Sequence, residues 1–202
     1  MPKLKLTKAE LKNQRDALKR FQRFLPTLEL KKEQLIVEIR RVESALDELR
    51  ERANEVEADL SRWVKLFSEP VEIEKKIALK NVVTERGNIA GVFIPVFTDA
   101  VFEKAPYDLY ETPLWVDRGV ATVEELATLQ IKREVCEEQK RLLERELRVT
   151  IQRINLFEKV MIPECKENIR RIQIYLGDQD ANAVARGKIA KAKLSDVQME
   201  NL

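Results

Sequence analysis

The sequence contains no histidine, and only two of its 202 residues are cysteines. Histidine is the commonest general base and the commonest metal ligand of proteins, so its absence removes the usual centre of both kinds of site. If Cys136 and Cys165 lie on one continuous helix, roughly 44 Å separate them at 1.5 Å per residue, which no disulfide spans. We therefore expect a reduced, intracellular chain with no metal site.

Glycine, proline and aromatic residues are also scarce, with 5 glycines, 7 prolines and 6% aromatic residues, whereas 36% of the residues are charged. This composition favours long helices and coiled coil over a thick globular core. The longest uncharged run, 87–98, has 12 residues, while a membrane-spanning helix needs roughly 20. The charged N-terminus lacks the apolar stretch of a signal peptide. These features predict a soluble cytoplasmic protein that does not insert into a membrane.

The first long segment carries the pattern of a coiled-coil helix. Thr7 can cap its start, with Glu10 closing a capping box and Leu6 stapling onto Leu11. Alternating steps of three and four then select a seam that is apolar except at Lys32. Such a sustained seam is typical of coiled coil, and Pro70 predicts its end. The seam residues are Leu18, Phe21, Leu25, Leu28, Lys32, Leu35, Ile39, Val42, Leu46, Leu49, Ala53, Val56, Leu60, Trp63 and Phe67.

The middle of the chain changes character. Its β-branched and aromatic residues predict a β-hairpin with strands at 82–85 and 89–97 and a turn at Gly87–Asn88. Pro95 indicates an edge or a strand end. The segment 102–119 has two prolines and little periodicity, so we expect it to be irregular. The whole section is too small for an independent enzyme domain.

A second helix is predicted from Thr122 as cap, with Glu125 completing the capping box, and Gly177 predicts its end. A helix-favouring, basic segment follows. The sequence therefore divides into an N-terminal coiled-coil helix (1–69), a tip with a β-hairpin (70–121), a C-terminal coiled-coil helix (122–177) and a basic C-terminal extension (178–202). The second seam contains Leu143, Leu147, Thr150, Ile154, Phe157, Met161, Cys165, Ile169, Ile172 and Leu176.

Two seam-bearing helices joined by a compact tip predict a mainly α fold, a long antiparallel two-helix coiled-coil hairpin. The predicted inner helix ends set a register in which Pro26 lies opposite Pro163 and Leu46 faces Leu143. The seam steps between 154 and 169 average 3.75 residues, which unwinds a left-handed supercoil locally. Pro163 also removes a helix hydrogen bond. We expect a kink at Pro26 and Pro163, although tolerated kinks without a function are the alternative.

No motif indicates catalysis or a cofactor. The glycines of 86–91 match no nucleotide-binding pattern, and the carboxylates of the helices read as a solvated face. Charge is uneven: residues 1–23 hold eight basic and two acidic groups, and residues 166–193 hold seven and three. Nucleic-acid binding is disfavoured because stacking aromatics are not interleaved with these cations. A protein cavity of opposite charge and a plain solvated end both remain open.

The run at 153–178 resembles the C-terminal helix of the D subunit of V-type and A-type rotary ATPases. The segments LPTLELKKEQL, GNIAGVFIPVF and TPLWVD follow in the order expected for that family, so the resemblance covers nearly the whole chain. The first helix departs from the family's frequent glycine followed by Leu-Leu-Lys-x-Lys-Arg-Asp, as in a divergent bacterial branch. The residues that carry the resemblance are Arg153, Asn155, Phe157, Glu158, Ile162, Pro163, Ile169 and Ile172.

The resemblance implies a non-catalytic central-stalk rotor subunit of a membrane-bound complex, peripheral to the membrane. Its helices would form a shaft within the hexamer of A and B subunits, where the A subunits handle ATP. The F subunit would clasp the coiled coil, and the lower part would rest on the adaptor of the membrane ring. Such a complex couples ATP hydrolysis or synthesis to ion transport. We expect contacts to the bore of the hexamer at Arg15, Arg20, Arg23, Arg170, Arg171, Arg186 and Lys188.

We place the face for the F subunit on the acidic middle of the coil, at Leu46, Leu49, Val56, Cys136 and Leu143. The alternative function is that of a free-standing cytoplasmic coiled-coil adaptor or tether, like the coiled coils of export apparatus. Seam periodicity does not separate the two functions. The prolines, the embedded hairpin and the family-like run favour the rotor.

Overall fold

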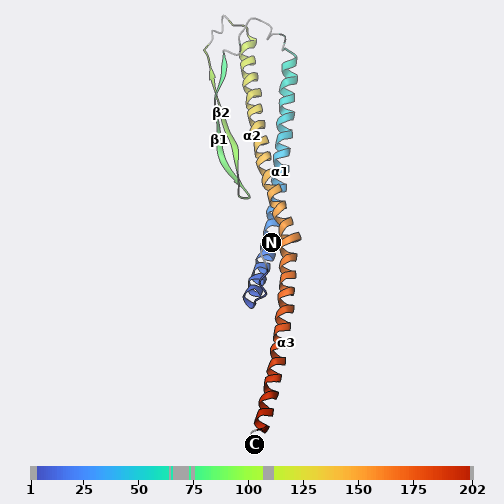
Figure 1. Cartoon of the computed structure of the whole chain (residues 1–202). Coiled ribbons are helices and arrows are strands. Elements are labelled where there is room, and N and C mark those ends of the chain that lie inside the picture. Colours follow the sequence, from blue (N-terminus) through green and yellow to red (C-terminus); the bar gives the residue numbers. More distant parts are fainter. Residues whose placement is uncertain (1–3, 64, 66–72, 74–75, 107–111, 201–202) are drawn as a thin grey trace. The chain divides into compact units, whose positions relative to one another are not determined.

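The structure is a computed structural model that describes residues 4–63, 65, 73, 76–106 and 112–200. Its elements are helix α1 (Lys8–Ser61), strands β1 (Ile77–Ile89) and β2 (Val92–Lys104), helix α2 (Trp115–Leu156), a π-helical turn η3 (Phe157–Met161) and helix α3 (Ile162–Glu200) (Figure 1). The predicted fold class, mainly α with an antiparallel helix hairpin and a small β-hairpin, is confirmed.

The chain forms two compact units. We call Lys31–Thr150 the hairpin unit, and Met1–Leu30 with Ile151–Leu202 the terminal unit. The division into four segments proposed from the sequence stays a prediction.

The hairpin unit is built on an apolar seam. The buried α1 residues Leu35, Ile39, Val42 and Leu46 are spaced by four, three and four, which keeps them on one helix face. They cluster with Leu143 of α2 and Ile94 of β2. The β-hairpin therefore adds its own side chain to the helix core and runs beside α2 (Figure 1).

The β-hairpin exists as predicted, but its turn and strand lengths were wrong. β1 and β2 pair antiparallel over 13 residues each, and the turn is at Ala90 and Gly91, which have φ of 49° and 80°. Positive φ at both turn residues matches the twist of the flanking strands. Asn88 fixes this turn because its Oδ1 accepts a 3.0 Å hydrogen bond from the Gly91 amide. Gly87 lies within β1 instead, where a Cβ would come within 2.8 Å of Val96.

The predicted start of the first helix is confirmed, because the Glu10 amide donates a 3.3 Å hydrogen bond to Thr7 Oγ1. Its end was placed too late. α1 ends at Ser61, and Trp63 lies in a turn after the helix, its amide donating to the Leu60 carbonyl. Phe67 and Pro70 lie outside the described residues.

The second helix starts earlier than predicted. α2 begins at Trp115, and Thr122 lies inside it, donating its hydroxyl to the Arg118 carbonyl rather than capping. The segment 102–119 is consequently less irregular than expected: β2 continues to Lys104 and α2 occupies its last residues. Residues 107–111 lie outside the described part.

These two errors displaced the predicted helix register. In the hairpin unit, Lys31 pairs with Glu146, Arg52 with Glu125 and Asp59 with Arg118. Counting from Lys31–Glu146 places Leu143 level with Leu35 rather than with Leu46. Both inner helix ends lie earlier in the chain than predicted: α1 ends at 61 rather than 67, and α2 begins at 115 rather than 122.

The predicted pairing of Pro26 with Pro163 is wrong for the same reason. Within the terminal unit the rings of Phe21 and Phe157 lie 5.0 Å apart. Moving along antiparallel helices from that contact carries Pro26 and Pro163 in opposite directions, to a separation of roughly 16 Å along the helix axis.

The predicted helix end at Gly177 is also wrong. α3 runs through Gly177 to Glu200. A glycine inside a helix costs only about 1 kcal/mol relative to alanine, and the residues that follow it are rich in alanine, the best helix former. The region around Pro163 does depart from a regular α-helix, since η3 immediately precedes α3.

Candidate functional site

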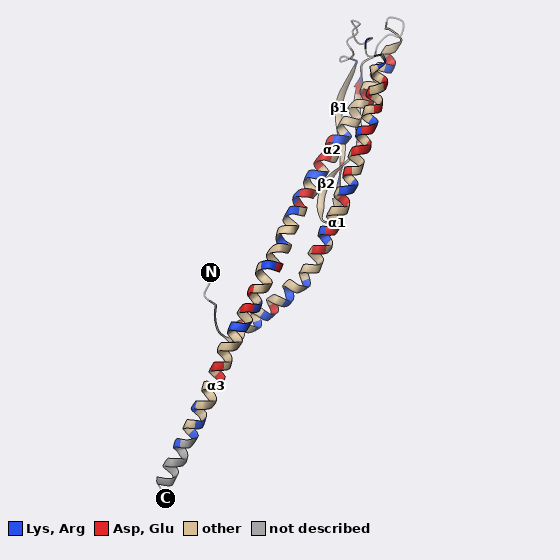
Figure 2. Ribbon diagram, turned by 90° about the vertical axis from the view of Figure 1, so that its right-hand side faces the viewer, with Lys and Arg blue, Asp and Glu red and all other residues tan. Residues whose placement is uncertain are grey.

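The terminal unit presents a basic surface. By sequence it holds 17 basic and 10 acidic residues, against 20 and 25 in the hairpin unit. The seven predicted hexamer contacts all lie in the terminal unit and are all exposed. Figure 2 shows Lys and Arg, in blue, recurring along α3. Only Arg171 among them forms an ion pair within the described residues, at 3.0 Å to Glu167. The other six cations are therefore available to an acidic partner, and their contact role stays a prediction.

The last part of the described α3 side chains is exposed throughout. From 177 to 191 each residue is solvent-accessible, including Val184 at 61% and Ile189 at 57%. An isolated helix is marginal in water and gains most of its stability from packing of an apolar face. This stretch therefore gains no such stabilisation from the described part of the chain.

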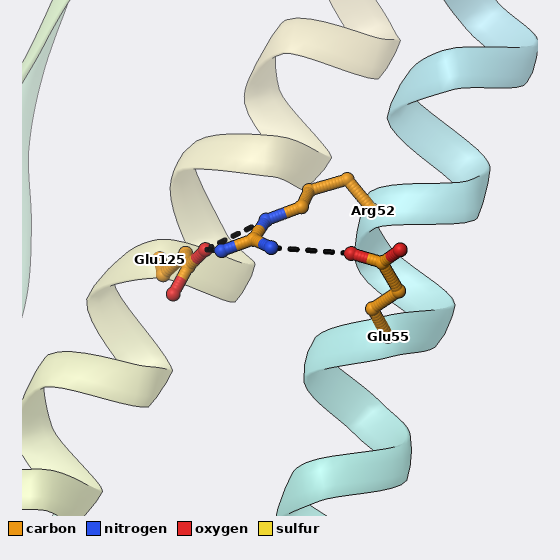
Figure 3. A network of polar contacts seen from close by, with 3 residues as sticks. All are labelled: Arg52, Glu55 and Glu125. Carbon is orange, nitrogen blue, oxygen red and sulfur yellow. Dashed lines mark hydrogen bonds and ion pairs between the residues drawn. The ribbon is translucent and has the colours of Figure 1, made fainter.

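A charged network joins the two helices of the hairpin unit. The Arg52 guanidinium donates to Glu125 of α2 at 2.7 Å and to Glu55 of its own helix at 3.1 Å (Figure 3). The Glu125 carboxylate, followed by Glu55, raises the pKa of Arg52. Because these groups are exposed, the network contributes little stability. It nevertheless favours one register of α1 against α2, because Arg52 lies beside Glu125 only in that register.

Further pairs between the helices repeat this arrangement. Lys140 Nζ lies 2.7 Å from Glu43, which raises the pKa of that lysine. Lys31 and Glu146 lie 2.6 Å apart, with both side chains only partly exposed. An ion pair of the same kind joins the β-hairpin to α2, since Lys104 Nζ of β2 lies 2.6 Å from the Glu124 carboxylate of α2. Charge pairing thus complements the apolar seam along the hairpin unit.

Three of the five residues predicted to face the F subunit are buried by the chain itself. Leu46, Val56 and Leu143 are 4%, 8% and 0% exposed. A side chain in the core offers no area to a partner, so these three support the packing of the hairpin unit. This part of the predicted face is therefore wrong, because seam residues were chosen and the seam is where α1 and α2 meet.

Leu49 and Cys136 are half-buried and line an open groove of about 600 Å³. The groove is mainly apolar, and β2 forms one wall with Val96 and Phe97. Lys132 lies over the Phe97 ring at 5.3 Å, and Gln139 donates a 2.5 Å hydrogen bond to the Pro95 carbonyl. Sequence reasoning missed the contribution of β2, although its apolar run at 92–97 was visible. Burial raises the pKa of the Cys136 thiol, which makes it a poor nucleophile.

The described residues contain no group of three or more His, Cys, Asp or Glu side chains that could hold a metal ion. Within the same residues no helix combines the length and the apolar character needed to cross a bilayer.

Comparison with known proteins identifies the family of the chain. Residues 10–192 match the family model for the D subunit of ATP synthase. The V-type ATP synthase D subunit of Borreliella burgdorferi is 47% identical over 194 residues, covering 96% of each chain. The proteins of the same name from Chlamydia muridarum and Chlamydia abortus are 36% and 33% identical, with at least 95% of this chain and 96% of each relative covered. The chain belongs to the family of ATP synthase D subunits.

Proposed function

We propose that the chain is the central-stalk rotor shaft of a V/A-type ATPase. In this function it couples ATP hydrolysis or synthesis in a hexamer of A and B subunits to ion transport across the membrane. The observation that carries the proposal is the family match over residues 10–192, together with relatives named as subunits of a V-type ATP synthase over almost their whole length. It acts as one non-catalytic part of a multi-subunit complex.

The terminal unit is the proposed contact to the hexamer. Its excess of cations and the exposed stretch 177–191 suit an acidic bore that covers the helix on several sides. Cations steer assembly and set orientation, whereas apolar side chains such as Val184 and Ile189 provide area to bury. In this function each A–B pair meets a different face of the chain, and rotation exchanges these faces.

The hairpin unit is the proposed site for the F subunit and for the adaptor of the membrane ring. The F subunit occupies the groove of Leu49 and Cys136 between α1, α2 and β2. The buried seam and the cross-helix ion pairs stiffen this unit, so that torque is transmitted rather than lost in sliding of α1 on α2. The chain works in the cytoplasm at the membrane surface, without insertion.

Co-expression of the chain with A, B and F subunits tests this function. We expect stoichiometric capture and an ATPase activity that depends on the chain. Removal of residues 178–202 and replacement of the seven predicted basic contacts by Gln are each expected to weaken capture by A and B while leaving F bound. Exposed cations of the hairpin unit, Arg41 and Arg62, replaced by Gln provide the matched control. If the chain binds none of these subunits, the rotor function is refuted, and the alternative function of a free-standing coiled-coil adaptor or tether takes its place.

A further inference from the structure

The π-helical turn η3 joins α2 to α3 within the terminal unit. The Ile162 amide donates its hydrogen bond to the Phe157 carbonyl, five residues earlier rather than four. Leu156 before the turn and Ile162 after it both keep α-helical dihedrals, with φ and ψ of −62° and −45°, and −67° and −48°. The turn is thus a local insertion in an otherwise α-helical ladder.

Pro163 explains why the insertion is stable here. In a regular α-helix residue 163 would donate to the Lys159 carbonyl, but proline has no N–H and its ring collides with that carbonyl, at a cost of roughly 3 kcal/mol. A wider turn moves the carbonyl away. The Ile162 amide is directed to Phe157, so the Glu158 carbonyl loses its α-helical donor, and its π-helical donor would be Pro163. Neither geometry completes the hydrogen bonds of this turn.

The turn is weakly held between two anchored segments. None of its five residues is buried, and Glu158, Lys159 and Val160 are exposed. Its ring contact is that of Phe157 with Phe21, at 5.0 Å. On either side the helix is fixed by side chains that are 9% exposed or less, at Ile154, Cys165 and Ile172. Between Ile154 and Ile172, a deformation of the helix therefore meets least resistance at 157–161.

We propose that η3 is a torsional joint, a place where the helix winds and unwinds while the turns on both sides stay packed. Each residue of an α-helix adds about 100° of rotation about the helix axis and 1.5 Å of rise along it. A partial change between π and α hydrogen bonding at η3 therefore rotates the residues after the turn by a large angle relative to those before it. The joint is a property of the chain itself. Its use as an elastic element between rotation steps rests on the proposed function.

Hydrogen exchange of the full-length chain tests the joint. We expect the amides of 158–162 to exchange at least about tenfold faster than those of 166–172, because opening of a local segment costs less where fewer side chains are packed. Pro163→Ala supplies an amide that can donate to the Lys159 carbonyl in the α geometry or to the Glu158 carbonyl in the π geometry. We therefore expect exchange at 158–162 to slow by about tenfold. Pro26→Ala is the matched control, because Pro26 also lies inside a helix, but α1 stays α-helical around it; it should leave 158–162 unchanged. Equal protection of the two segments in the unmodified chain, or no effect of Pro163→Ala, would overturn the proposal.

A deletion provides a second, independent test. If η3 is one inserted residue, removing Val160 in the Pro163→Ala background leaves an α-helix in which Cys165 and Ile172 keep the orientation relative to Ile154 that they have in the structure. We expect its thermal midpoint to stay within a few degrees of the background. Deleting the exposed Lys166 in the same background re-phases Ile172 and should lower the midpoint clearly more. Equal losses would refute the inserted-residue description. Both tests use the free chain, so their failure is distinguishable from failure to assemble with A and B.

Discussion

Replacing Leu143 by Ala distinguishes a core residue from a partner-binding residue. Leu143 is 0% exposed and clusters with four α1 residues and Ile94 of β2. Leucine-to-alanine changes in cores cost about 2–5 kcal/mol. Since a core between two helices can partly close around the lost volume, we expect about 3 kcal/mol. For a chain of this size that corresponds to a fall of roughly 6–12 °C in the thermal midpoint.

The assay is urea and thermal unfolding of the full-length chain followed by circular dichroism. Leu30→Ala is the matched control, because Leu30 is on a helix but 59% exposed, and Leu and Ala have similar helix propensities. We expect a change below about 0.5 kcal/mol for the control. Once folded, Leu143→Ala should still capture the F subunit. If both variants lost the same stability, or if Leu143→Ala kept its stability and lost the F subunit, the assignment of Leu143 to the core would be refuted.

Three further predictions concern the turn, the ion pairs and the thiols. Gly91→Ala should destabilise the hairpin by about 1–2 kcal/mol because Gly91 has φ of 80° with open space around it, whereas Gly177→Ala inside α3 should stabilise its helix by about 0.5–1 kcal/mol; hydrogen exchange measures both, and equal signs would contradict the reasoning. The hydrogen bond from Arg141 lowers the pKa of Glu138, so this pair contributes above the ordinary carboxyl pKa and its contribution disappears as the pH falls through the lowered value, as NMR titration of the unmodified chain and of Arg141→Gln would show. Burial raises the pKa of both cysteine thiols, so alkylation should accelerate only well above neutral pH and should reach half-buried Cys136 before Cys165; fast labelling of Cys165 at neutral pH would argue against a packed terminal unit.

The helices and the β-hairpin were predictable because their signals are local. The seam through Leu35, Ile39, Val42 and Leu46 repeats with helical spacing, and β-branched residues mark the strands. The inner ends of the helices were not predictable in the same way, because residues that cap helices are also common inside them: Thr122 bonds back to Arg118 rather than capping. Pro113, whose carbonyl accepts from the Val116 amide, was the overlooked signal for the start of α2.

The candidate surfaces were predictable only in part. Exposure of the basic residues follows from their charge. Which seam residues are buried and which are exposed depends on the register of α1 against α2, and that register was predicted wrongly because the helix ends were misplaced. The groove was not predictable, because it requires β2 to lie against α1 and α2. The stretched seam at 154–169 correctly located an irregularity, but an average of 3.75 residues per step fits both a straight α-helix and a π turn.

The two-stranded sheet has a consequence for the chain before it meets any partner. Among the residues that the structure describes, each strand has a single neighbour, so β1 has an edge of 13 residues that no described strand covers, with Leu79 and Val83 exposed. Such an edge invites pairing with another newly made chain. Lys80 and Arg86 lie along β1, and irregularities interrupt the pairing at Leu79/Asn81 and Val83/Thr84. Charges and bulges of this kind oppose the growth of intermolecular sheets, so these residues protect the newly synthesised subunit from aggregation while it waits to be assembled.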